Sequence, residues 1–145
     1  MNDADHEHLV ERLRQAVQAR PEILDAYLFG SRARGGTTPE SDIDLAIIVD
    51  RDQAPASPFG YASALASDLM SATHENRIDV VVLNDAPPLI YHRVLRDGIR
   101  LLARQLEATT SREGRALSRY CDYMIQLRKI DSAHAARIER GTFGR

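Results

Sequence analysis

The stretch "GSRARGGTTPESDID" (residues 30–44) decides how the rest of the chain is interpreted. It follows the short apolar segment "DAYLFG" (25–30) and leads into "DIDLAIIVD" (42–50), the strongest strand pattern of the sequence. Two aspartates, one residue apart, therefore come directly after a polar loop that begins with Gly-Ser. Such a segment is either an ordinary turn between two strands or the edge of a site that holds phosphate groups and a metal ion.

Length and composition predict a single globular domain over residues 1–145, of which about 107–145 form a C-terminal helix and tail. The chain is 43% hydrophobic and 28% charged, and its formal net charge is −2. That balance is ordinary for a globular protein and argues against a large non-specific nucleic-acid surface. The apolar runs are too short to cross a membrane, and the N-terminus lacks a secretory pattern, so we expect a cytoplasmic protein.

The hydrophobic pattern predicts an α/β (α+β) layer fold in which helices pack on a mixed four-stranded sheet. Segment 42–50 is continuously apolar after its aspartates, which is typical of a central strand covered on both faces. The predicted elements are helix 5–19, strand 25–30, strand 42–50, helix 59–74, strand 77–83, helix 89–96, strand 98–102 and a helix from about 107.

Three finer expectations concern the loops and the C-terminal helix. Ser57 and Pro58 are predicted to cap the second helix as N-cap and N1, after a loop at 51–60 that is the only one long enough to act as a lid. The single cysteine, Cys121, excludes an internal disulfide and is expected to be a buried or half-buried thiol. It belongs to one predicted helical stripe with Leu117, Tyr120, Met124 and Leu127. The tail after Ile130 either extends this helix or lies free.

Asp42 and Asp44 are candidate metal ligands. In a strand, residues i and i+2 point to the same side, so the two carboxylates project together. Neighbouring carboxylates repel unless a cation lies between them, and Mg²⁺ favours one or two carboxylates together with phosphate oxygens and water. The alternative is that Asp42 caps a turn and Asp44 lies at a solvated strand end.

Asp79 strengthens this interpretation, since it interrupts the otherwise apolar strand 77–83. A buried acidic side chain is costly unless it is satisfied. If this strand pairs beside 42–50, Asp79 completes a cluster of three carboxylates, which can hold two metal ions for a phosphoryl displacement. The alternative is a structural Asp79 bonded to Arg77 or to the backbone.

The opening residues of the loop are candidate nucleotide ligands. Gly30 permits a close approach of the backbone to a phosphate, and Ser31 offers a hydroxyl and an N–H. Arg32 and Arg34 are either contacts to phosphate oxygens or solvated surface side chains. Phosphate donors on one side and metal ligands on the other predict a site for a nucleoside triphosphate.

The spacing Gly-Ser, ten residues, then Asp-x-Asp with a later aspartate resembles the DNA polymerase beta superfamily of nucleotidyltransferases. More closely, the chain resembles the minimal nucleotidyltransferase (MNT) proteins, the antitoxin partners of HEPN ribonuclease toxins, over roughly residues 9–127. The resemblance rests on "GSRARG", "SDIDLAIIV", "RIDVVVL", "VLRDGIRLL" and "RYCDYMIQL". It implies a polymerase-beta-like fold, in which Gly30 and Ser31 hold the triphosphate of ATP.

The same resemblance implies the chemistry. Asp42 and Asp44 would ligate Mg²⁺, two ions in all, and Asp79 would be both a ligand and the base that accepts the proton of the attacking hydroxyl. The implied reaction is transfer of AMP to a tyrosine of a HEPN toxin, with release of pyrophosphate. Two alternatives stay open: transfer to a small hydroxylated molecule such as an antibiotic, and a non-catalytic antitoxin that acts by binding alone.

Overall fold

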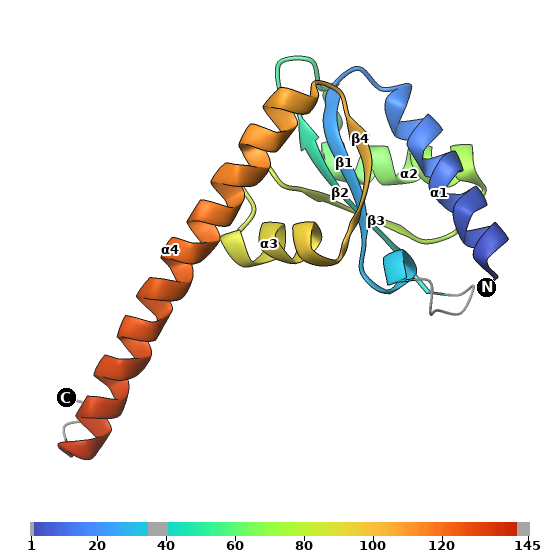
Figure 1. The fold of residues 1–145 in the computed structure, drawn as a ribbon. Helices are drawn as coiled ribbons and strands as arrows, with labels where there is room; N and C mark the ends of the chain where they lie inside the picture. The colour runs from blue at the N-terminus through green and yellow to red at the C-terminus, as the bar shows by residue number, and fades with distance from the viewer. Residues whose placement is uncertain (1, 35–40, 142–145) are drawn as a thin grey trace.

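A mixed four-stranded sheet forms the middle of the protein in a computed structural model that describes residues 2–34 and 41–141 (Figure 1). The sheet has the order β3-β2-β1-β4; β1 is antiparallel to both of its neighbours, and β2 and β3 are parallel. All four predicted strands are confirmed, with ends that differ by one or two residues. Their bounds are β1 (Ile23–Phe29), β2 (Ile43–Val49), β3 (Ile78–Val82) and β4 (Ile99–Ala103).

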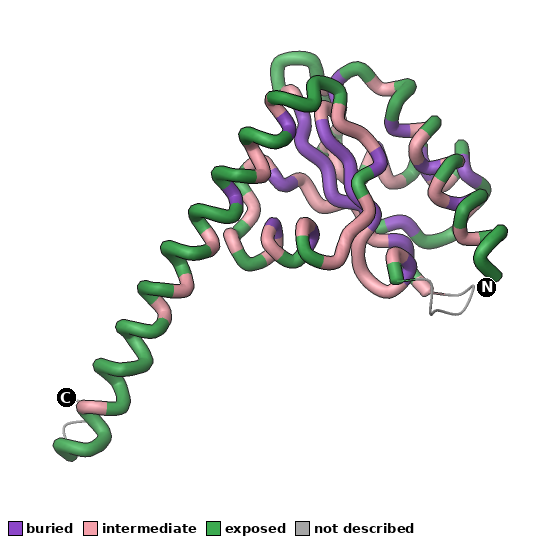
Figure 2. Tube along the Cα trace, in the orientation of Figure 1, coloured by how far each residue is buried: buried purple, intermediate pink, exposed green. Residues whose placement is uncertain are grey.

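Helices cover both faces of the sheet (Figures 1 and 2). One buried cluster joins α1 (Asp3–Gln18) and α2 (Tyr61–Thr73) to one face, and a second joins α3 (Pro88–Asp97) and α4 (Leu106–Glu139) to the other. The first cluster contains Leu9, Leu13, Val17, Leu65 and Leu69 with Ile43, Leu45, Ile47 and Val49. The second contains Tyr91, Val94 and Ala116 with Tyr27, Ala46 and Ile48.

Strand β2 shows why this sequence forms a central strand. Its odd-numbered residues pack against α1 and α2, and its even-numbered residues from 46 onward pack against α3 and α4. Apolar side chains at successive positions are therefore all removed from water, as a strand covered on both faces requires. By contrast, β3 lies at the sheet edge and its residues after Ile78 are half-buried or exposed, so the buried strand that the apolar pattern at 77–83 predicts is not observed.

The start of α2 also differs from the expectation. The helix begins at Tyr61, and its N-cap is Gly60 with φ 87°, a value that favours glycine. The N–H of Gly60 donates to the carbonyl oxygen of Ser57 (3.2 Å), which closes a turn before the helix. The predicted cap at Ser57 and Pro58 is therefore wrong by about one helical turn.

Helix α4 continues far beyond the helix on which it packs (Figures 1 and 2). It has 34 residues and α3 has 10, so at 1.5 Å per residue their lengths are about 51 Å and about 15 Å. The tail after Ile130 thus extends the helix, to Glu139. Although α4 is long, no helix in the described part of the chain is both long and apolar enough to span a membrane.

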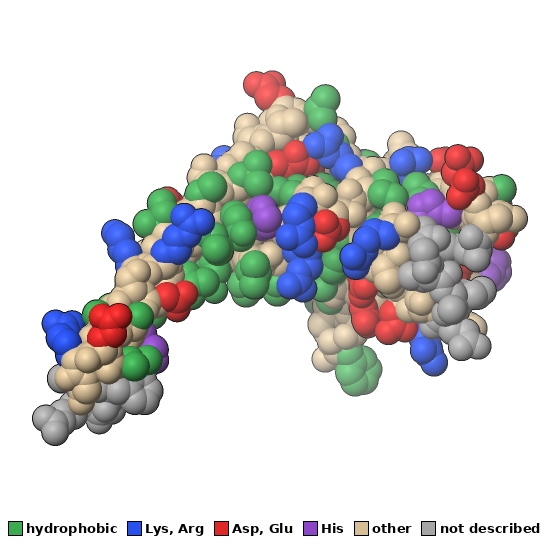
Figure 3. Space-filling view, turned by 60° about the horizontal axis from the view of Figure 1, so that its bottom comes forward, with side chains coloured by type: hydrophobic (Ala, Val, Ile, Leu, Met, Phe, Trp, Pro, Cys, Tyr) green, Lys and Arg blue, Asp and Glu red, His purple; other side chains and the backbone are tan. Residues whose placement is uncertain are grey.

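The predicted stripe of α4 is confirmed only in part. Tyr120 is half-buried and stacks on His92 of α3, with ring centroids 3.6 Å apart. Leu117 is 46% exposed, however, and the Cys121 thiol is exposed, so the expectation of a buried cysteine is wrong. A helical stripe is buried only where a second element covers it: α3 covers Tyr120 but leaves the sides of α4 that carry Leu117 and Cys121 open. Hydrophobic side chains lie uncovered along the projecting length of α4 (Figure 3).

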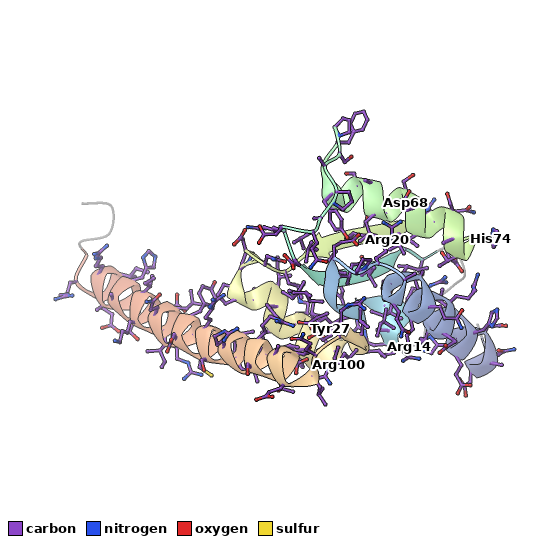
Figure 4. All side chains as sticks on the ribbon, turned by 90° about the horizontal axis from the view of Figure 1, so that it is seen from above. Arg14, Arg20, Tyr27, Asp68, His74 and Arg100 are labelled. Carbon is purple, nitrogen blue, oxygen red and sulfur yellow. The ribbon has the colours of Figure 1, made fainter. Side chains whose placement is uncertain are left out.

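A buried carboxylate anchors the first half of α4 to the sheet. Asp25 of β1 has no exposed surface and accepts hydrogen bonds from Thr109 Oγ1 (2.5 Å) and from Arg112 Nε and Nη2 (2.7 and 2.9 Å). Beside it, the Tyr27 hydroxyl donates to Glu113 Oε1 (2.7 Å), which Arg100 of β4 also contacts (Figure 4). Buried polar groups whose hydrogen bonds are all formed allow fewer positions of the helix on the sheet than apolar contacts alone would allow.

Candidate active site

Asp44 and Asp79 lie side by side at the edge of the sheet where β2 and β3 begin. The two strands are parallel, and Asp44 pairs with Asp79 in their register. Neighbouring strands are about 4.8 Å apart, and paired residues point to the same face. Since Leu45 packs against α1 and α2, both carboxylates project from the opposite face, on which α3 and α4 pack.

Asp42 stands one residue before β2 and is exposed. A backbone hydrogen bond from Ile43 N to the carbonyl oxygen of Arg77 (3.0 Å) continues the pairing of β2 with β3 to this point. The side chain of Arg77 lies 3.8 Å from Asp42 Oδ1, an exposed ion pair. One basic side chain therefore stands next to a site that is otherwise acidic.

The three carboxylates are close enough to influence one another. The pKa of Asp44 is raised above its ordinary value, first by partial burial and then by the negative charges of Asp79 and Asp42. Each of these causes disfavours the ionised form. A bound cation would remove this electrostatic cost.

Gly30 brings the backbone of the Gly30–Ser31 turn directly against this cluster. It ends β1 with φ 73°, a left-handed conformation, and β1 pairs with β2 so that Phe29 faces Asp44. A Cβ atom on residue 30 would lie 2.2 Å from Asp44 Oδ2. Glycine is required here twice over, by the backbone conformation and by the space.

The turn continues as the short 3-10 helix η1 (Ser31–Arg34). Ser31 is half-buried at its start, next to Gly30. Arg34 is exposed. The pKa of Asp97, at the end of α3, is lowered mainly by a hydrogen bond from Arg96, and the positive charges of Arg34 and Arg93 lower it further. The remainder of the predicted loop, residues 35–40, lies outside the described residues.

Arg32 has a different environment from the one that its sequence position suggests. It is 3% exposed, and its Nη2 lies 3.4 Å from Glu75 Oε2. Glu75 follows α2 and also contacts Arg12 of α1. Arg32 is thus directed to the α1 and α2 side of the sheet, whereas Asp44 and Asp79 project from the other side.

Oxygen ligands and crowded negative charge fit a hard divalent cation such as Mg²⁺. Within residues 2–34 and 41–141, no three acidic, histidine or cysteine side chains already enclose a metal position by themselves. In proteins, Mg²⁺ often takes one or two carboxylates and completes its coordination with phosphate oxygens and water. The assignment of Asp42, Asp44 and Asp79 as metal ligands stays a prediction.

Two acidic residues that support the architecture were not singled out from the sequence. Asp25 interrupts the apolar strand β1, a signal of the kind that drew attention to Asp79, but it is buried under α4 and paired with Arg112. Glu75 lies in a polar turn and has no local signal. Its partners Arg12 and Arg32 are 63 and 43 residues away in the sequence.

Comparison with known proteins gives a family match over the region that holds this site. Residues 11–107 match the family described as "Polymerase beta, Nucleotidyltransferase". Over 85 residues the chain is 35% identical to "Protein adenylyltransferase MntA" of Aphanizomenon flos-aquae (strain 2012/KM1/D3). That alignment covers 54% of this chain and 55% of the relative, so the match spans about half of the relative's length.

Solved structures share the fold over most of the chain. A chain of a toxin–antitoxin structure with AMP-PNP superposes with a TM-score of 0.68 at 22% identity, covering 86% of this chain and 96% of that one. A chain of a complex between the tri-AMPylated HEPN toxin of Shewanella oneidensis and an MNT antitoxin gives 0.65 at 21% identity, covering 88% and 97%. At these identities, the likeness shows that the fold is shared.

Proposed function

The chain belongs to the polymerase beta nucleotidyltransferase family, and from this premise we propose that it transfers AMP from ATP to a tyrosine of a HEPN ribonuclease toxin. In this proposal the protein is the antitoxin of the pair, and modification of the tyrosine silences the toxin. The observation that carries the proposal is the position of Asp44, which lies against Gly30 on one side and pairs with Asp79 on the other. The Gly30–Ser31 turn, to which we assign phosphate binding, thus lies beside two carboxylates where β2 and β3 begin.

The acceptor is inferred from the relative. "Protein adenylyltransferase MntA" is 35% identical over the aligned half of its length, and its name describes transfer of an adenylyl group to a protein. The chains of similar fold come from toxin–antitoxin structures, one with AMP-PNP and one with an AMPylated HEPN toxin. Together these descriptions favour a protein acceptor over an antibiotic or another small molecule.

The shape of the chain supports a large acceptor as well. The loop at 51–60 follows the C-terminal end of β2, whereas Asp44 lies at the N-terminal end of that strand. A seven-residue strand is about 23 Å long, so this loop is not a lid over the carboxylates. A folded partner would itself supply the surface that excludes water from the reacting groups.

The roles of the residues follow from their positions. Gly30 and Ser31 would hold the triphosphate, and Asp42, Asp44 and Asp79 would hold Mg²⁺. When bound, Mg²⁺ would neutralise charge on the phosphate oxygens. A carboxylate oxygen of Asp79 would accept the proton of the tyrosine hydroxyl as its oxygen bonds to the α-phosphorus. The bond from that phosphorus to the bridging oxygen would break, and pyrophosphate would leave.

A mass measurement tests the proposal. The protein is incubated with a purified HEPN toxin, ATP and Mg²⁺, and the intact mass of the toxin is recorded with its ribonuclease activity. We expect a gain of whole AMP units and loss of RNA cleavage, both prevented by chelation of the metal. The matched control is the Asp42→Asn/Asp44→Asn double variant, which should leave the toxin unmodified and active. Full neutralisation of an unmodified toxin by that variant would instead establish blocking by binding alone.

A further inference from the structure

The carboxylate of Glu75 lies between two arginine side chains that come from separate parts of the chain. Its Oε1 is 3.0 Å from Arg12 Nη2, and its Oε2 is 3.4 Å from Arg32 Nη2. Arg12 also donates through Nη1 to the carbonyl oxygen of Thr73, the last residue of α2. Each oxygen of Glu75 therefore has its own basic partner, and we call these three side chains the Arg12–Glu75–Arg32 clamp.

The clamp is shielded from solvent on the side of the nucleotide-binding turn. The side chain of Arg32 is 4% exposed, and that of Glu75 is 21% exposed. Ion pairs in such surroundings are screened far less than surface pairs, and loss of one partner leaves a poorly solvated charge behind. The pair between Glu75 and Arg32 thus resists separation more than a surface pair would.

The three members of the clamp come from the elements that have to be aligned around the site. Arg32 is the second residue of η1 and directly follows Gly30 and Ser31. Glu75 lies in the turn between α2 and β3, four residues before Asp79. At the start of this turn, His74 adopts a left-handed conformation (φ 59°) at the end of α2 (Figure 4).

We propose that Glu75 is a positioning residue that, through Arg32, holds the Gly30–Ser31 turn at a fixed distance from Asp79. The proposal rests on the proposed function and adds to it a second anchor of the turn, on the side opposite the carboxylates. Gly30 meets Asp44 on one side of the sheet, and Arg32 meets Glu75 on the other. The turn is therefore packed closely against Asp44 on one side and ion-paired with Glu75 on the other before any nucleotide is present.

This arrangement changes the role of Arg32. A side chain that is directed toward α1 and α2 and paired with Glu75 acts on the nucleotide through the backbone of its own turn, without touching a phosphate group. Glu75 in turn reaches no reacting atom. Both are positioning residues, and their loss should loosen the turn and weaken ATP binding more than it slows the chemical step.

Hydrogen exchange of the full-length protein without ATP tests the clamp directly. In Glu75→Gln, which keeps the size and removes the charge, we expect the backbone amides of 31–34 to exchange about ten times faster, because local opening becomes easier. The dissociation constant for ATP should rise about tenfold, and KM for ATP should rise more than kcat falls. Arg32→Met should act in the same direction, and Arg32→Lys should restore part of the ATP affinity.

The control is Glu11→Gln, which removes an exposed ion pair with Arg14 (2.9 Å) on α1, the helix of Arg12. It should change neither the exchange rate of the amides at 31–34 nor the dissociation constant for ATP. Wild-type exchange and wild-type ATP affinity in Glu75→Gln would overturn the proposal. A uniform rise of exchange over the whole chain would also overturn it, because it would mark Glu75 as a general stabilising residue. If the wild-type protein transfers no AMP while exchange at 31–34 still rises locally, the proposed function fails and the clamp is supported.

Discussion

The Cα atom of Gly30 faces the carboxylate of Asp44 so closely that a Cβ atom at residue 30 would lie 2.2 Å from Asp44 Oδ2. The glycine directly follows β1 and the aspartate is the second residue of β2, so this contact joins the two halves of the Gly-Ser and Asp-x-Asp pattern. The approach depends on a positive φ at residue 30 (73°) and on the pairing of Phe29 with Asp44. Any side chain at residue 30 would displace either the turn or the carboxylate.

Gly30→Ala is expected to impair the site and to destabilise the fold. The left-handed backbone costs alanine about 1–2 kcal/mol, and a displacement of about 1 Å at a catalytic group can lower the rate about a hundredfold. Thermal unfolding and AMP-transfer rates would measure the two effects. Gly114→Ala is the matched control: Gly114 lies within α4 with no atom within 4 Å of its added Cβ, and alanine there should stabilise the helix by about 0.5–1 kcal/mol. Equal behaviour of the two variants would contradict the role given to Gly30.

Asp44→Asn should stabilise the metal-free protein at neutral pH. The folded-state pKa of Asp44 is raised above 3.8, so the folded protein binds this proton more tightly than the unfolded chain does. The stability that protonation contributes is therefore present below pH 3.8 and is lost as the pH rises through the raised pKa. The extra stability of Asp44→Asn over wild type should be largest above the raised pKa and should vanish below pH 3.8, where Asp44 is protonated in both states. Melting temperatures across this range, recorded without divalent metal, measure the effect.

The exposed Asp122 on α4 provides the control for that series. Asp122→Asn should shift the melting temperature little and show no such dependence on pH. An Asp44→Asn protein that is less stable than wild type at neutral pH would show that the carboxylate is satisfied by protein groups, and would weaken the case for a cation at this site.

Asp79→Asn should abolish transfer while the fold remains intact. Asp79 is exposed on the edge strand β3, so loss of its charge should change the free energy of unfolding by no more than about 0.5 kcal/mol. If Asp79 accepts the proton of the acceptor hydroxyl, single-turnover rates with saturating ATP should fall by at least about a hundredfold. A lower melting temperature with unchanged activity per folded molecule would instead assign Asp79 a structural role.

Arg112→Met should destabilise the protein strongly without acting on the site. It would leave the fully buried Asp25 carboxylate without its main partner, and breaking a buried pair in this way costs about 3–5 kcal/mol. Chemical denaturation measures the loss. The double variant Asp25→Asn/Arg112→Met should recover part of it, since asparagine carries no charge to bury. A loss below about 1 kcal/mol in Arg112→Met would show that solvent reaches Asp25.

Removal of residues 131–145 should leave the core unchanged. From Asp131 to Arg140, α4 is exposed apart from the half-buried Ala136, so few contacts are lost, and the free energy of unfolding should change by less than about 1 kcal/mol. Denaturant titration of the truncated chain measures this. A large loss of stability in the isolated protein would show that the projecting half of α4 packs against another part of the molecule in solution.

The order of the helices and strands could be predicted from the sequence, and so could a candidate site whose chemistry stays a prediction. Alternating and helical patterns depend on residues a few positions apart, so β2 and α3 could be predicted to within one or two residues. The spacing of Gly30 and Ser31 before Asp42 and Asp44 indicated a phosphate-binding turn followed by carboxylates. Asp79 was singled out because an acidic residue is costly in a strand that is expected to be buried; in the structure it is exposed on the edge strand, so that reason does not hold.

Which of these residues lie in contact depends on the tertiary structure. Pairing of β2 with β3 placed Asp79 beside Asp44, and the sheet edge left β3 half-exposed. Arg32 is buried and paired with Glu75, an environment that neither of the two roles considered from the sequence, a phosphate contact or a solvated side chain, had indicated. Packing of α3 on α4 covered Tyr120 and left the neighbouring Cys121 exposed. These outcomes depend on contacts between residues far apart in the chain. Secondary-structure propensity and hydrophobic periodicity are properties of one segment, so they do not show which other segment will pack against it.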